Sequence, residues 1–512
     1  MNRMQSTDLS LPSRRRQALT TACTTGLLAL GMASSAWAVT GGQGGAGTAR
    51  GGSYNSGGQS GDGSGGNPGS SGKGGNGGNS TVASGGTGGD AGIVPNMTSS
   101  VTTSVTGAPG GSGNAAVTPG NGGGGGGGGD GAFIGAGLVL TVNPSVLVSA
   151  GVGGNGGPGF NAAFVGGGGG GGGSGVELQN ASLANYGTII GGEGGAGASG
   201  SALPTSSGGG GGGNGVVVSV GNVTIINGGT ISAGAAGNGG SGGQSGTNGA
   251  AILFNGDGGF NNLGLFSSSV ISGDIESASG TVHIYTKNSA VTLSSNILLD
   301  NSSLLYVTTN PSPLTITGVV SGSGYLQVAG STTLTLSGTN TFTGGSNVYS
   351  GKLQVDGSIG DVNVGAASLG GNGTVGNITL SSSGAIVPGG SPGTLEGNSL
   401  LWNGGGVLDF QLGATNSTTD TDLLALSGGL TKGDATNPKF KFHLSSGNGT
   451  PTQGTTYTLI SFGSNSGFSA GDFSFDTDGT FNVCAKFSLT GGALQFTVRS
   501  VTPDYVFCSD FE

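Results

Sequence analysis

The chain has 512 residues, of which 124 are glycine, 7% are charged and 6% are aromatic, and its formal net charge at pH 7 is −10. Ordinary globular domains contain about 7% glycine and about 25% charged residues, so this composition excludes an ordinary compact enzyme. Valine, isoleucine and leucine gather into short alternating runs after Phe133. A random glycine-rich coil therefore does not describe the whole chain.

Residues 1–38 are typical of an export signal, with an arginine run at 14–16, an apolar stretch at 18–32 and small residues at 36–38. We expect Sec-type export with cleavage after Ala38, and the twin-arginine route is the alternative. The apolar stretch is shorter than the about 20 residues of a membrane span, so no transmembrane span is expected in the mature chain. Cleavage removes four arginines and one aspartate and leaves a net charge of −13. No basic cluster remains, so nucleic acid is not an expected partner.

Residues 39–131 consist mostly of glycine, serine, asparagine and threonine. Such a segment buries too little apolar surface to offset the entropy of ordering it. This composition predicts a disordered, protease-sensitive spacer, in which only residues 101–105 can form an isolated strand.

An internal repeat occupies residues 132–274. Val176 and Val216 begin equivalent aliphatic runs 40 residues apart, and the second runs at Ile189 and Ile231 are 42 residues apart. Two strands in each unit of about 40 residues predict a stacked β-structure, since one unit cannot bury its own apolar face. The runs 138–142 and 251–254 are interpreted as the flanking copies. Glycine-rich inserts at one point of the period are expected to project from one face as a contact surface, either mobile or held by backbone pairing; they cover 151–173, 191–213 and 234–249.

Short alternating runs follow one another closely in residues 275–422, separated by turns of glycine, asparagine, serine and proline. No segment of the mature chain has a helical period. The pattern predicts an all-β parallel solenoid with glycine-rich loops, and a β-sandwich of repeats is the alternative.

Within this region, residues 330–395 carry four ordered motifs: Leu334–Gly345, Ser350–Val355, Leu369–Gly376 and Pro388–Leu395. This stretch resembles the autotransporter-associated β-strand repeat. The resemblance implies a right-handed parallel β-helix displayed outside a Gram-negative bacterium. The inward-facing pairs would be Leu334/Leu336, Leu353/Val355, Val362/Val364 and Ile378/Leu380. Asn340 and Asn372 would be either stacked polar corners or ordinary turn residues.

The C-terminal part departs from this family. A full autotransporter continues into a membrane barrel with strands of 9–11 residues, and residues 423–512 contain no such strands. We expect residues 423–502 to form a β-rich cap and 503–512 a tail of unassigned role. Translocation of the chain by its own barrel is not expected.

Residues that could perform catalysis are few and scattered. His283 and His443 are 160 positions apart and are expected at solvent-facing strand positions. Two carboxylate pairs have the spacing of one strand face and could serve a β-helix lyase or glycosidase, but no basic residues cluster near them; they are Asp274/Glu276 and Asp420/Asp422. We expect no catalytic and no cofactor-binding residue.

Metal and nucleotide sites have equally weak support. Asp62, Asp130 and Asp257 lie beside glycine, but the calcium nonapeptide is not repeated in tandem. The glycine run 122–129 lacks the ending of a phosphate loop. We expect no metal ligand and no cofactor.

Two cysteines, Cys484 and Cys508, remain after signal cleavage. An oxidising compartment allows them to form a disulfide that fastens the tail to the body, and two free thiols are the alternative. Closing a loop of this length stabilises the folded state by about 3 kcal/mol.

Export, repetition and the scarcity of catalytic groupings predict a cell-surface or extracellular structural protein that resembles an adhesin. Its partner would be an unidentified surface, glycan or matrix ligand. The alternative function is a β-helical polysaccharide-processing enzyme.

Overall fold

The computed structural model describes residues 56, 59, 67, 73–80, 82–89, 99–198, 207–240, 242–255, 258–390, 392–434 and 440–501. These residues form 39 strands and one 3-10 helix of three residues, η1 (Ala470–Asp472). In this part of the chain no helix is long and apolar enough to cross a membrane.

The strands form four sheets of 18, nine, seven and five strands. The 18-stranded sheet contains β1 (Ser99–Val101), β4 (Val139–Val142), β7 (Ser182–Asn185), β10 (Thr224–Asn227), β13 (Phe260–Leu265), β16 (Thr281–Thr286), β19 (Leu304–Thr309), β22 (Tyr325–Gly330), β24 (Ser346–Val348), β26 (Val362–Val364), β28 (Thr374–Leu380), β30 (Thr394–Trp402), β32 (Leu423–Leu426), β33 (Gly429–Lys432), β35 (Thr456–Ser461), β36 (Ser464–Ser466), β38 (Cys484–Leu489) and β39 (Ala493–Ser500). The nine-stranded sheet contains β17 (Val291–Leu293), β20 (Leu314–Ile316), β23 (Thr333–Leu336), β25 (Lys352–Val355), β27 (Ser368–Gly371), β29 (Ala385–Pro388), β31 (Val407–Leu412), β34 (Phe440–Ser446) and β37 (Phe473–Thr477).

The two smaller sheets complete the early turns of the structure. The seven-stranded sheet contains β3 (Ala132–Ile134), β6 (Val176–Gln179), β9 (Val216–Val220), β12 (Ile252–Phe254), β15 (Ile275–Ser277), β18 (Ile297–Leu299) and β21 (Val320–Gly322). The five-stranded sheet contains β2 (Val105–Thr106), β5 (Leu147–Ser149), β8 (Thr188–Ile190), β11 (Thr230–Ser232) and β14 (Val270–Ser272).

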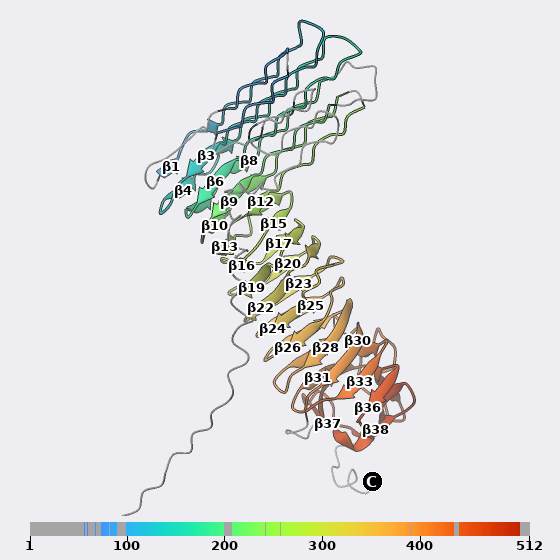
Figure 1. Cartoon of the computed structure of the whole chain (residues 1–512). Coiled ribbons are helices and arrows are strands. Elements are labelled where there is room, and N and C mark those ends of the chain that lie inside the picture. The colour runs from blue at the N-terminus through green and yellow to red at the C-terminus, as the bar shows by residue number, and fades with distance from the viewer. Residues whose placement is uncertain are drawn as a thin grey trace, which may run out of the picture. The chain divides into compact units, whose positions relative to one another are not determined.

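The chain is an all-β parallel solenoid. Each early turn contributes one strand to the seven-stranded, the 18-stranded and the five-stranded sheet in that order, and from β17 the nine-stranded sheet replaces the five-stranded one. Equivalent strands of successive turns pair in parallel, and Figure 1 shows them stacked in chain order. At the C-terminal end, β39 pairs antiparallel with β35 and β38 and forms the β-rich cap.

The repeat offsets in the sequence are the strand registers of the structure. Val176 pairs with Val216, and Ile189 pairs with Ile231, which confirms both offsets. The interpretation of residues 138–142 as a copy of the Val176 run is wrong. That run forms β4 and pairs with β7 in the 18-stranded sheet, whereas the strand equivalent to β6 is β3.

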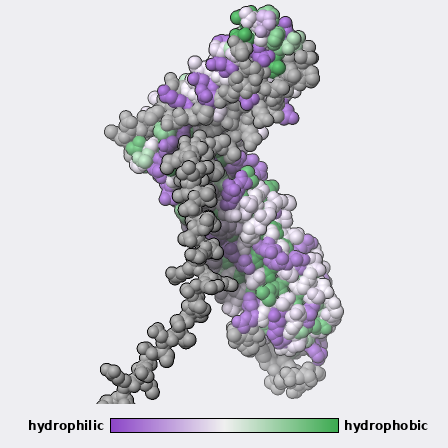
Figure 2. Space-filling model, in the orientation of Figure 1, coloured by the Kyte–Doolittle hydropathy of each residue, from purple (hydrophilic) through white to green (hydrophobic). Residues whose placement is uncertain are grey.

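Alternate residues of each strand fill the interior. The predicted inward pairs Leu334/Leu336 and Leu353/Val355 have no exposed side-chain surface, and Val362, Val364, Ile378 and Leu380 are at most 1% exposed. Each such side chain contributes about 1.5–3 kcal/mol through its burial. Figure 2 accordingly shows small apolar areas among polar ones on the face in view.

The glycine-rich inserts are ordered, and their backbones hydrogen-bond to one another. All leave the solenoid at one corner, between the five-stranded and the seven-stranded sheet, as residues 107–131, 150–175, 191–215 and 233–251. Their bonds recur at every third residue. One set of amides donates antiparallel within the insert 150–175: Gly167 to Gly157, Gly170 to Gly154 and Gly173 to Gly151. A period of three without internal bonds is that of the extended polyproline II helix, so we describe the inserts as a polyglycine bundle.

Glycine is required in the bundle because the segments touch on every side. The segment 122–129 donates to three neighbours in rotation: Gly123 and Gly126 to Asn114 and Gly111, Gly122 and Gly125 to Val165 and Gly168, and Gly124 and Gly127 to Gly78 and Gly75. A Cβ atom built on Gly126 would lie 2.0 Å from the carbonyl oxygen of Thr87. No side chain can be accommodated at such a distance.

The prediction of a disordered spacer over 39–131 differs from what the structure shows. Residues 73–80, 82–89 and 107–131 belong to the polyglycine bundle. The stretch 101–105 is not an isolated strand, since β1 pairs with β4 and β2 pairs with β5. The ordering entropy is offset here by backbone hydrogen bonds between inserts and not by apolar burial. The rest of the predicted spacer lies outside the described residues.

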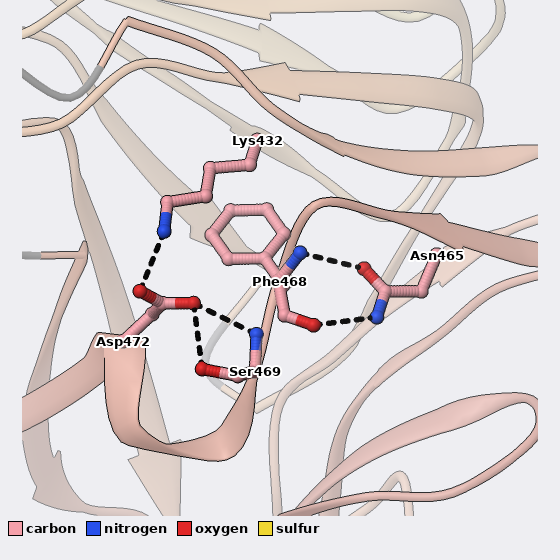
Figure 3. Close-up of polar contacts among 5 residues, drawn as sticks. All are labelled: Lys432, Asn465, Phe468, Ser469 and Asp472. Atoms are coloured by element: carbon pink, nitrogen blue, oxygen red, sulfur yellow. Dashed lines mark hydrogen bonds and ion pairs between the residues drawn. The ribbon is translucent and has the colours of Figure 1, made fainter.

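The cap has an aromatic core and a charged bracket. Trp402 is fully buried and packs edge-on against Phe440 and Phe442 at 5.4 and 5.5 Å between ring centroids. Figure 3 shows Asp472 between Lys432, at 2.5 Å, and Ser469. Burial alone would raise the pKa of Asp472, but the hydrogen bonds from Lys432 and Ser469 outweigh burial and hold it below the usual value. This bracket fastens η1 to β33.

Candidate functional site

The two histidines lie on different sheets. His283, on β16, is half-buried, and both ring nitrogens are bonded: Nδ1 to Asn262 Oδ1 at 2.9 Å and Nε2 to Thr308 Oγ1 at 2.8 Å. Burial lowers the pKa of His283, so its ring is neutral at pH 7. His443, on β34, bonds through Nδ1 to Asp476 Oδ1 at 2.8 Å, and Lys441 forms an ion pair with the same carboxylate. Each histidine is thus held by its neighbours on the sheet.

The carboxylate pair Asp274/Glu276 is brought together, and Asp300 joins it from the next turn. Burial first, and then the charges of Asp274 and Asp300, raise the pKa of Glu276 from 4.5 to about 7. Asp274 accepts a hydrogen bond from Asn296 at 3.0 Å. A carboxyl group with a raised pKa beside an ionised one can act as a general acid. This is the one predicted pair with catalytic character.

The pair Asp420/Asp422 does not form a site. Asp422 is buried, and its two oxygens accept the backbone N–H groups of Gly393 and Gln411, each at 2.8 Å. Burial raises the pKa of Asp422 to about 6 against these hydrogen bonds. Asp420 instead accepts a hydrogen bond from Thr415 at 2.5 Å. Asp422 therefore links two loops of the solenoid.

Of the three aspartates considered for calcium, only Asp130 lies among the described residues. It is buried at the base of the polyglycine bundle, where Oδ1 accepts the N–H of Ser174 at 2.6 Å. Asp62 and Asp257 lie outside the described residues. Within the described ranges, no group of three or more histidine, cysteine, aspartate or glutamate side chains could hold a metal ion.

Asn340 and Asn372 do not stack on each other. Asn340 is buried, accepts the N–H of Val320 at 2.8 Å and donates to the carbonyl of Ser358 at 3.0 Å, so it joins neighbouring turns of the solenoid. Asn372 accepts the N–H of Gly390 at 3.2 Å. Stacked polar corners do occur elsewhere, because buried Asn185 donates to buried Asn227 at 2.8 Å.

Cys484 begins β38 and is disulfide-bonded. Cys508 lies outside the described residues, so the pairing of these two cysteines stays a prediction. We expect a single cross-linked peptide containing both cysteines in non-reduced digests of exported protein analysed by mass spectrometry. Recovery of both as alkylatable thiols would contradict the pairing.

An aromatic cluster on the outer face of the 18-stranded sheet was not anticipated. The His283 ring stacks on Tyr306 of β19 at 4.9 Å and on Tyr285 of its own strand at 5.1 Å, and Phe260 of β13 lies 5.6 Å away. Tyr285 lies over Gly264, where a Cβ atom would be 2.8 Å from its hydroxyl oxygen. These four rings form what we call the aromatic platform.

Beyond the platform, the same face continues into amide side chains and a groove. The register places His283 and Tyr306 in one row with Gln327, Asn347 and Asn363. Asn363 donates to Asn347 at 3.1 Å. A groove of about 660 Å³ opens beside this row, and its lining includes Asn340, Phe342, Thr343, Asp361 and Asn363.

The sequence pattern contained a signal for the platform. Asn262, His283, Tyr306 and Gln327 follow at intervals of 21 to 23 residues, which is the length of one turn in this part of the chain. Each residue also lies between two inward aliphatic residues. Aligning outward strand positions by turn would have placed these four residues side by side.

Comparison with known proteins identifies no relative: no protein-family model matches the chain, and no curated protein matches it.

Proposed function

We propose that this chain is an exported structural protein of the outer surface or extracellular space of a Gram-negative bacterium, with an adhesin-like role. The observation that carries the proposal is the polyglycine bundle, in which inserts from successive turns are fixed to one another by backbone hydrogen bonds. Such a bundle holds the insert turns in fixed positions at one corner of the solenoid. The export signal and the resemblance to the autotransporter-associated repeat support the same role.

The insert turns carry exposed apolar side chains. Val117 is 82% exposed and Phe160 is 43% exposed, and Phe164 packs edge-on against Phe160 at 6.5 Å between ring centroids. Exposed apolar residues on a rigid support are typical of interaction surfaces. The insert turns are therefore the proposed contact surface of the adhesin-like protein.

Cell fractionation and attachment assays test this role. In a Gram-negative host that expresses the full chain, we expect protease-accessible protein at the cell surface or in the medium, and stronger attachment of cells to a protein-matrix-coated surface. The double variant Val117→Ser/Phe160→Ser is expected to lower the attached fraction several-fold, because it removes the exposed apolar surface of two inserts. Leu401→Ser is the matched control, since Leu401 is an exposed apolar residue of β30. Retention of the protein in the cytoplasm would contradict the proposal.

A β-helical polysaccharide-processing enzyme remains the second candidate, because Glu276 has the raised pKa of a general acid beside Asp274. Turnover of a polysaccharide by the wild-type chain that Asp274→Ala and Glu276→Gln both abolish would favour the enzyme. Absence of reducing-end release across a panel of polysaccharides would favour the structural role.

A further inference from the structure

The aromatic platform is a preorganised surface. Both ring nitrogens of His283 are hydrogen-bonded, and its ring is packed by Tyr285 and Tyr306. Gly264 leaves the space that Tyr285 occupies above the sheet. Side chains fixed before binding lose little conformational entropy when a ligand arrives. The platform thus has the rigidity that a binding surface requires.

The chemistry of this face is aromatic and polar but uncharged. Asn262, Thr308 and Gln327 surround the rings and offer amide and hydroxyl groups, and the His283 ring is neutral at pH 7. Lys287, 5.6 Å from the Tyr285 ring centroid, and Asp361, in the groove, are opposite charges on its two flanks. Such a face has no net attraction for a strongly anionic or cationic partner.

The platform and the groove form one surface. Tyr325 of β22 lies against Gly344 of the groove wall, where a Cβ atom would be 2.7 Å from its own Cβ. The row of Gln327, Asn347 and Asn363 runs from the rings to the groove across successive strands. Neighbouring strands are about 4.8 Å apart, so an extended ligand lying across the strands meets an aromatic or amide group on every turn.

We propose that this surface, from the aromatic platform to the groove beside Asn363, binds a neutral polysaccharide. Sugar rings present C–H groups that pack on aromatic rings, and hydroxyl groups that bond to amides and other hydroxyls, which is the combination of groups on this face. A protein partner would need a more apolar surface, and an acidic polysaccharide would need basic side chains. The assignment rests on the proposed extracellular role, because that role brings the chain into contact with polysaccharides.

Affinity electrophoresis of the purified full chain tests the assignment directly. We expect retardation in gels containing at least one of three neutral polysaccharides, a β-glucan, a xylan or a galactomannan, and none in gels containing polygalacturonate. Tyr306→Ala is expected to weaken the retardation at least tenfold, whereas Tyr306→Phe keeps the ring and most of the binding. Val270→Ala is the matched control, since Val270 is an exposed apolar residue of the five-stranded sheet, and it is expected to bind as the wild type does.

Three outcomes would overturn the assignment: no retardation by any of the neutral polysaccharides, retardation by polygalacturonate alone, or equal binding by Tyr306→Ala and the wild type. Circular dichroism of Tyr306→Ala shows whether its fold is kept, and the aromatic variant Tyr285→Ala gives a second measurement at the same surface. Failure of export or of surface attachment leaves these gel measurements unchanged, so the two proposals are tested separately.

Discussion

Replacement of Gly170 by alanine is expected to separate the second insert from the first. The amide of Gly170 donates to Gly154 at 2.7 Å, and a Cβ atom at this position would lie 2.0 Å from the carbonyl oxygen of Gly126. Both nearest partners are backbone, so no side chain can move aside. Loss of several hydrogen bonds, each worth about 0.5–1.5 kcal/mol, lowers the local stability of the bundle by about 3 kcal/mol or more.

Hydrogen–deuterium exchange measures this effect segment by segment. We expect the amides of residues 151–173 to lose protection in Gly170→Ala, while β16 to β31 keep theirs, because the turns of a solenoid depend mainly on their neighbours. Gly135→Ala is the matched control, since nothing lies within 4 Å of a Cβ atom built there. Equal protection of residues 151–173 in Gly170→Ala and the wild type would show that the bundle does not form as described.

Glu276→Gln is expected to stabilise the protein at pH 8 and to have little effect at pH 4. The folded-state pKa of Glu276 is about 7, above its model value of 4.5, so the folded state holds the proton more tightly than the unfolded state does. Stability contributed by the protonated group is fully present below pH 4.5 and is lost as the pH rises through 7. A shift of this size corresponds to about 3 kcal/mol, and partial exposure to solvent reduces this to about 2 kcal/mol.

Thermal unfolding at the two pH values checks the sign of this effect. Glutamine is uncharged at both, so the variant is expected to unfold at a higher temperature than the wild type at pH 8 only. Asp300→Asn removes one of the two charges that act on Glu276 and is expected to give a smaller gain of the same sign. Glu396→Gln, at an exposed position of β30, is the control for adding an amide. A gain at pH 4 as large as that at pH 8 would refute the role of ionisation.

The parts of the fold that repetition specifies could be predicted from the sequence. The pairing of Ile189 with Ile231 follows from two copies with the same spacing, and the inward direction of Leu334 and Leu336 follows from strict alternation. The strand β7 was missed because Ser-Leu-Ala-Asn contains only one large aliphatic residue. Its inward asparagine, Asn185, is satisfied by Asn227 of the next turn, a partner that no local pattern reveals.

The polyglycine bundle escaped prediction for a related reason. The entropy of ordering 122–129 was weighed against what that segment alone could bury, whereas its hydrogen-bond partners lie in other inserts, as with Gly125 and Gly168. The aromatic platform also depends on partners in other turns. His283 is an isolated residue in the sequence, and only the strand register brings Asn262 and Tyr306 to its two sides.

The period of three in the polyglycine bundle restricts how inserts can change in length. One residue added to an arm turns every later residue by a third of a turn and mismatches all of its hydrogen bonds, whereas three residues added to each arm lengthen the hairpin and keep the pattern. The inserts 191–215 and 233–251 differ by six residues, or one triplet in each arm. Insertions and deletions tolerated at this corner should therefore come in steps of six, so that the reach of the inserts can evolve without altering the solenoid beneath them.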